Sequence, residues 1–152
     1  GTETQLDSIW MLVDASLKTT QELGTFNITN IEAIKFHIGI EQDFNHGDPT
    51  LFHTSHPLSP KSPSMHWGWT SGYRFIALEG KAGSSLSNAF ELHGLGDKNY
   101  HETTVSVSAS ATNNIIDINL YADYTKAFIF FCLIMPFLSG NKLMFLTAVT
   151  NL

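Results

Sequence analysis

Several runs of this chain alternate apolar and polar residues with a period of two, and this pattern constrains the fold more than any other feature. The alternation occurs in the runs 34–40, 73–78, 90–93, 103–109 and 116–120. Such a period is typical of strands that bury one face in a core. Combinations of Gly, Pro, Asp and Asn that favour turns lie between the runs. The sequence therefore predicts an all-β fold, an antiparallel β-sandwich with long loops.

The size and composition fit a single domain over residues 1–152. A chain of 152 residues buries about 68–70% of the surface that its unfolded form exposes. The net charge is −6 and the eight basic residues are scattered, which excludes a nucleic-acid interface, because phosphates require clustered Lys and Arg. With 14% charged residues and much Ser, Thr, Asn and Gly, the surface is typical of an extracytoplasmic protein.

The ends of the chain give two further expectations. Gly1 fits a chain that has lost a leader, with or without a lipid-modified cysteine as in a lipoprotein. Cys132 is the one cysteine, which excludes an internal disulfide, and it lies in an apolar run that predicts a small buried side chain.

The apolar C-terminal segment, residues 127–152, is too broken to span a membrane as a helix. Its first apolar run covers 127–138, and a spanning helix needs about 20 apolar residues. Apolar residues resume at 143–149. We expect a buried core pair or a surface that docks on a partner. Helices over 124–133 and, more weakly, over 6–17 are alternatives.

The segment 41–64 is long for a loop in a compact domain and contains four prolines. Loops of this length are usually functional or disordered, and this one supplies His46, His53 and His56. We expect His46 and His101 to be solvated in loops and His37 to point outward from a strand. The oxygen-rich patch of Asp43, Asn45 and Asp48 is a weak calcium candidate and is better explained as a solvated turn.

The run Met65-His66-Trp67-Gly68-Trp69 follows directly, and its imidazole and thioether groups suit copper. If residues 64–75 are extended, Met65, Trp67 and Trp69 share one face and His66 points the other way, towards His53 and His56. His93, on a later predicted strand, is then the best candidate to complete a metal site. The alternatives are that the indoles pack in the core and that His66 is a hydrogen-bonded structural residue.

Four short stretches in this part of the chain resemble a known family. They are His56-Pro57-Leu58, Met65-His66-Trp67-Gly68-Trp69, Gly72-Tyr73-Arg74-Phe75 and Leu78-Glu79-Gly80. Together they resemble the MbnP-type copper-binding proteins, which are related to MopE and CorA of methane-oxidising bacteria. The resemblance covers about residues 28–124, and the C-terminal segment departs from the usual C-terminal strands of the family.

The resemblance implies a periplasmic protein or one on the bacterial outer-membrane surface. In the family, two or more histidines bind copper, often with a tryptophan oxidised to kynurenine. The matching positions here are His56, His66 and, through the further match Phe90-Glu91-Leu92-His93-Gly94, His93, with Trp67 or Trp69 as the modified residue. The family also implies a dihaem peroxidase-like enzyme as the partner that oxidises the tryptophan.

Two functions from different classes follow. The first is an extracytoplasmic copper-binding protein, not an enzyme, that captures or relays copper. The alternative is a non-metal structural or interaction subunit of a bacterial cell-envelope assembly that docks through residues 127–152.

Overall fold

The computed structural model describes residues 4, 6, 9–15, 17 and 20–124, together with the backbone of 142–148. Its strands are β1 (Ile9–Asp14), β2 (Asn30–Ile38), β3 (Arg74–Ala82), β4 (Asn88–Leu95), β5 (His101–Ser110) and β6 (Lys142–Ala148). Its helical segments are short: α1 (Gln42–Asn45), η1 (Pro49–Leu51) and η2 (Asp97–Asn99). Every strand pair is antiparallel, so the predicted all-β antiparallel fold is confirmed.

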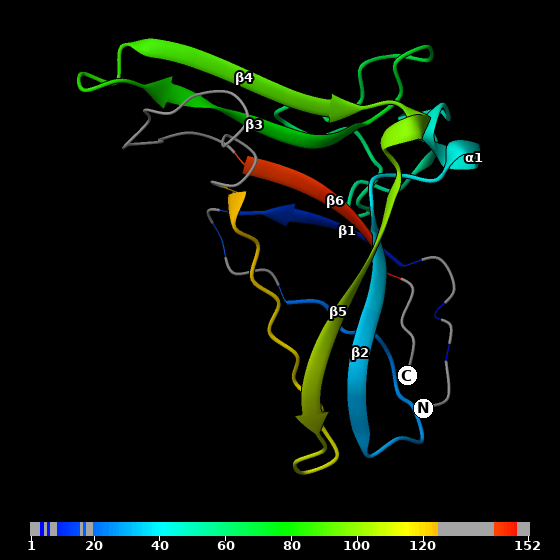
Figure 1. The fold of residues 1–152 in the computed structure, drawn as a ribbon. Helices are drawn as coiled ribbons and strands as arrows, with labels where there is room; N and C mark the ends of the chain where they lie inside the picture. Colours follow the sequence, from blue (N-terminus) through cyan, green and yellow to red (C-terminus); the bar gives the residue numbers. More distant parts are fainter. Residues whose placement is uncertain are drawn as a thin grey trace.

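Strand β6 joins the described strands into one hydrogen-bonded sheet. One of its edges pairs with β1, and the other pairs with β3 over 142–144 and with β2 over 146–148. Strand β4 extends the sheet beyond β3, and β5 extends it beyond β2. In Figure 1 the β3–β4 pair lies across the top and the β2–β5 pair runs downward, with β6 and β1 where the two pairs meet. The sheet thus consists of two strand pairs, β3–β4 and β2–β5, that β6 joins.

Alternate residues of the sheet pack in two separate cores. Strand β1 shows this directly, because Trp10 and Leu12 pack in one core while Met11 and Val13 pack in the other. The first core consists of Ile40, Leu58, Met65, Tyr73, Phe75 and Ala77. The second consists of Ile31, Ile34 and Phe36. Both faces of β1 are therefore covered, as its side-chain period of two requires.

Two irregular segments contribute to these cores. The connection between β2 and β3 supplies Leu58 and Met65 to the first core, where they are 0% and 1% exposed. Residues 111–124 pack against the second core through Ile116, Ile118 and Tyr124. The β2–β3 connection is therefore part of the hydrophobic core rather than a peripheral loop.

Gly39 directs the chain from the second core to the first. It follows β2 with φ of +115°, a conformation that L side chains rarely adopt. A Cβ atom at this position would lie 2.6 Å from the Phe75 ring. Ile40 then enters the first core, although Phe36, four residues earlier, belongs to the second. Glycine is required here both by its backbone angle and by the close approach of Phe75.

The structure corrects two of the predicted elements. Residues 6–17 contain β1, so the helix considered there is wrong. Residues 116–120 form no strand, although Ile116 and Ile118 are half-buried while their neighbours are exposed. The alternation there reflects side chains that pack on the second core without a strand partner.

The apolar C-terminal segment divides into two parts. Residues 127–141 and 149–152, which include Cys132, lie outside the described residues. Residues 142–148 form β6, between β1 on one side and β2 and β3 on the other. Within the described part of the chain, no helix is long and apolar enough to cross a membrane.

Candidate metal site

Residues 66–72 form a closed turn before β3, which we call the histidine–tryptophan loop. The amide of Trp67 donates to the carbonyl of Gly72 at 2.9 Å, and the amide of Gly72 donates to the carbonyl of Gly68 at 2.8 Å. Gly68 and Gly72 have φ of +90° and +69°, values that side chains disfavour. The prediction that residues 64–75 are extended is therefore wrong, because two glycines reverse the chain.

This turn separates the side chains that the extended prediction placed on one face. Met65 is 1% exposed and belongs to the first core. Trp67 and Trp69 are 51% and 61% exposed, so the alternative that the indoles are core residues is also wrong. The loop presents two large indoles to solvent beside His66.

His66 has one ring nitrogen without a partner. Its Nε2 is buried and has no hydrogen-bond partner among the described residues. Its Nδ1 accepts from the amide of Gly68 at 3.3 Å, the long end of the range. The ring contacts Tyr73 edge-on, with centroids 4.8 Å apart, and Trp69 at 6.0 Å.

The environment of His66 favours the neutral ring. Burial lowers the pKa of His66, with the charge of Asp48 opposing and that of His46 adding to the effect. A neutral imidazole is the form that binds metal ions. Because Nδ1 accepts from Gly68, the neutral His66 ring carries its proton on Nε2. Metal binding at Nε2 would move that proton to Nδ1 and would break only the long hydrogen bond from the Gly68 amide.

His93 lies on β4 within a charged cluster. Glu79 Oε1 is 2.6 Å from Arg74 Nη1 and 2.7 Å from His93 Nε2. Nε2 of His93 also lies 3.0 Å from Arg74 Nη1. The carboxylate can only accept and the guanidinium can only donate, so these contacts leave either ring nitrogen of His93 as the potential metal ligand. The ring meets Trp67 edge-on at 4.9 Å, and the Arg74 guanidinium lies 5.4 Å from the Trp67 ring centroid. A carboxylate behind a histidine in this way is common around metal sites.

His56 and His53 lie on the β2–β3 connection in different surroundings. The His56 ring stacks on Phe52 at 4.4 Å and lies 5.4 Å from Trp10, and its Nδ1 accepts from the amide of Leu58 at 3.1 Å. Burial lowers the pKa of His56, and the charge of Lys61 adds to this. His53 is exposed, and its Nδ1 lies 2.8 Å from the hydroxyl oxygen of Ser55.

The predicted ligands thus fall into separate contact groups. His66 contacts Trp69, His93 contacts Trp67, and His56 contacts Phe52 and Trp10. Over the described residues, no three His, Cys, Asp or Glu side chains stand in an arrangement that could hold a metal ion. The set His53, His56, His66, His93, Trp67 and Trp69 therefore stays a prediction.

Two of these histidines are nevertheless linked through core residues. His66 packs against Tyr73, whose hydroxyl donates to the carbonyl of Leu58 at 2.6 Å. The amide of Leu58 in turn donates to His56 Nδ1. Burial raises the pKa of Tyr73 to about 12, so its hydroxyl keeps this proton at neutral pH. The histidine–tryptophan loop and the His56 segment are joined at this buried bond.

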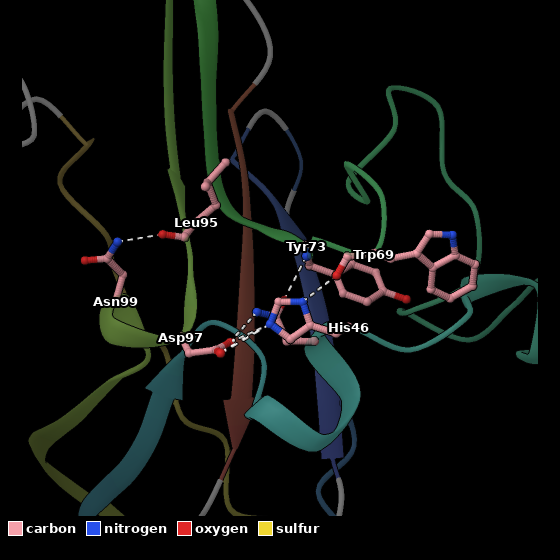
Figure 2. A network of polar contacts seen from close by, with 7 residues as sticks. His46, Trp69, Tyr73, Leu95, Asp97 and Asn99 are labelled. Carbon is pink, nitrogen blue, oxygen red and sulfur yellow. Dashed lines mark hydrogen bonds and ion pairs between the residues drawn. The ribbon is translucent and has the colours of Figure 1, made fainter. Parts of the chain in front are cut away.

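Sequence reasoning missed a polar network beside the loop, which Figure 2 shows. His46 Nδ1 lies 2.7 Å from the carbonyl oxygen of Trp69, and its Nε2 lies 3.2 Å from each carboxylate oxygen of Asp97. Asn45 donates to Asp97 at 2.7 Å and accepts from the amide of Tyr73 at 2.8 Å. His46, expected to be solvated, keeps 37% of its side chain exposed and also connects the loop to η2. No periodicity could reveal this, because the contacts join residues about fifty positions apart.

Two residues of the calcium candidate, Asn45 and Asp48, use side-chain oxygen atoms in internal hydrogen bonds. Asn45 is 0% exposed and fully engaged in the network above, which contradicts its expected place in a solvated turn. Asp48 accepts from the amide and the hydroxyl of Thr50. These internal hydrogen bonds give both residues a structural role.

The two other histidines are placed partly as expected. His37 is half-buried on β2 and stacks on Tyr100 with centroids 4.5 Å apart. His101 is exposed as expected, but it begins β5 rather than lying in a loop.

Fold and loop together define an antiparallel all-β domain that presents histidines and tryptophans from its β2–β3 connection. The sequence model of the MbnP family matches residues 1–144. The chain therefore belongs to the MbnP family, which is associated with copper binding and is typically extracytoplasmic. No curated protein and no solved structure matches the chain.

The Asp97 carboxylate gives a pH-dependent prediction. Hydrogen bonds from Asn45, and then from His46, lower the pKa of Asp97 below its ordinary value of 3.8. Its stabilisation is therefore present above pH 3.8 and is lost as the pH falls through the lowered folded-state pKa. We expect Asp97→Asn to lower the free energy of unfolding by about 1 kcal/mol at neutral pH, since solvent screens a side chain that is a third exposed.

Chemical denaturation between pH 3 and pH 7 measures this difference. The gap between Asp97→Asn and the wild type is expected to narrow steadily on the acid side. A gap of constant size across the whole range would show that the carboxylate charge contributes nothing.

Proposed function

We propose that this chain is an extracytoplasmic copper-binding protein that captures or relays copper through histidine side chains, without turnover of its own. Membership of the MbnP family supports copper as the metal that the chain binds. The observation that carries the proposal is the buried Nε2 of His66, which has no partner among the described residues. A buried polar atom left unpaired costs about 1–3 kcal/mol, and a metal ion bound there would remove that cost.

The chemistry of the donors supports copper over harder metals. Imidazole nitrogens suit copper, whereas calcium and magnesium prefer oxygen ligands. Burial lowers the pKa of both His66 and His56, so both rings are neutral and ready to bind at neutral pH. When bound, copper would supply charge and ligand-exchange chemistry, while the chain holds its imidazoles in place.

We propose His66 as the primary ligand and His56 as its partner. Both lie against the buried bond between Tyr73 and Leu58, which holds their two segments together. His93 is the alternative second ligand, and His53 is the more exposed choice. A site with two histidines needs no cluster of three, so the absence of such a cluster among the described residues is compatible with it.

The proposal includes an oxidised tryptophan in the protein from its native source. Trp67 and Trp69 are both half-exposed and both touch a histidine ring, so an oxidising partner enzyme could reach either. Peptide mass mapping of natively produced protein tests this. The expected peptide has lost one carbon and gained one oxygen at position 67 or 69. Unmodified mass at both positions would leave copper binding to histidine alone.

The alternative function, docking on an envelope assembly through residues 127–152, is not favoured. Residues 142–148 pair with three strands of the sheet, so that part of the segment is used within the fold.

Substitution of His66 tests the proposed ligand. We expect His66→Ala to weaken copper binding by about a hundredfold or more, since loss of a supporting group alone costs 10–100-fold. His101→Ala, on an exposed strand position, is the matched control and should bind as the wild type does. Competition with a colorimetric Cu(I) chelator measures both, and thermal unfolding checks that each variant folds. Equal affinities in all three proteins would exclude His66 as a ligand.

A further inference from the structure

Three segments distant in sequence meet beside the histidine–tryptophan loop (Figure 2). They are the end of α1, the loop itself, and η2 at the start of the connection from β4 to β5. Asn45 is 0% exposed and bonds both to Asp97 and to the amide of Tyr73, where the loop ends. Gly72 leaves the space for this carboxamide, because a Cβ there would lie 2.5 Å from Asn45 Oδ1.

His46 reaches the tip of the same loop. A carbonyl oxygen accepts hydrogen bonds only, so His46 Nδ1 donates to the carbonyl of Trp69 at 2.7 Å. On its other side, Nε2 faces the carboxylate of Asp97 at 3.2 Å. The His46 ring thus lies between η2 and the loop, and Asp97 fixes the orientation of the ring.

The loop transmits this contact to His66. Its ends are closed by the bonds between Trp67 and Gly72 and between Gly72 and Gly68. His66 forms an isolated bridge with Tyr73, whose amide Asn45 holds. Fixing the Trp69 carbonyl therefore restricts the remaining freedom of a short closed turn that carries His66 and both indoles.

We propose that His46 is a positioning residue for the histidine–tryptophan loop and that Asp97 orients it for this task. The bond from Nδ1 to the Trp69 carbonyl holds the loop in the arrangement that presents His66. This inference rests on the proposed function where it concerns copper, but the loop geometry can be measured without any metal. Groups that support a ligand in this way commonly contribute 10–100-fold to metal affinity.

Two conservative substitutions separate the two bonds of His46. In His46→Asn the side-chain amide lies near the position of Nδ1, so the bond to the Trp69 carbonyl can be kept. In His46→Gln the amide lies near the position of Nε2, so only the contact with Asp97 can be kept. If His46 served only general stability, both variants would behave alike. His101→Asn and His101→Gln are matched controls on an exposed strand position.

The first measurement uses metal-free protein and NMR backbone amide signals of residues 67–72, with the Trp69 indole signal. We expect wild-type signals in His46→Asn, and broadened or displaced signals confined to the loop in His46→Gln. Unchanged signals in both variants, or the same change in both, would overturn the positioning role. Thermal unfolding confirms that each variant is folded.

The second measurement is copper affinity, by competition with a Cu(I) chelator. We expect about a tenfold loss in His46→Gln and partial or full rescue in His46→Asn. Equal affinity of His46→Gln and wild type would overturn the inference for copper. A wild-type protein that binds no copper would instead refute the proposed function, and the metal-free spectra would still decide whether His46 positions the loop.

Discussion

Three buried polar groups fix the conformation of the long connection between β2 and β3, and the candidate site depends on them. The carboxamide of Asn45 bonds to Asp97 and Tyr73, the hydroxyl of Tyr73 bonds to Leu58, and the hydroxyl of Ser59 bonds to the carbonyls of Thr54 and His56. A buried polar group that loses its partner costs about 1–3 kcal/mol. The connection therefore adopts one specific arrangement, whereas apolar contacts alone would permit several.

This arrangement explains why a segment that is irregular in its backbone can still present fixed histidines. Leu58 and Met65 belong to the first core, so the residues next to them in sequence, including His66, start from fixed positions. Trp67 and Trp69 lie in the turn that Gly68 and Gly72 form, outside the core, and their side chains are exposed. The division between buried and exposed residues within five consecutive positions gives the loop both a rigid base and an accessible surface.

The sequence predicted the strands better than the site. Runs such as 103–109 and 90–93 became β5 and β4 because their period of two matches a half-buried strand. Strand β1 was not predicted, because both its faces pack in cores and its apolar residues do not alternate with polar ones. At 116–120 the alternation was present without a strand, since burial of Ile116 and Ile118 requires no hydrogen-bonded neighbour.

The site residues were predicted by chemical type rather than by position. The grouping of His66 with two tryptophans was visible in the sequence, but the turn at Gly68 and Gly72 was not, and it separates Met65 from the indoles. His46 was assigned to solvent because its partners, the Trp69 carbonyl and Asp97, come together only in the folded chain. Residues linked by tertiary hydrogen bonds leave no periodic signal in one sequence.

The most direct test of the account follows the imidazole nitrogens themselves. Protein with isotope-labelled histidine is titrated with Cu(I), and the ring nitrogen chemical shifts are recorded by NMR. We predict that the signal of His66 Nε2 shifts most, that the signal of a second histidine shifts in parallel, and that the signals of exposed His101 do not shift. Shifts absent from His66 at saturating copper would contradict the central claim that this buried nitrogen binds the metal.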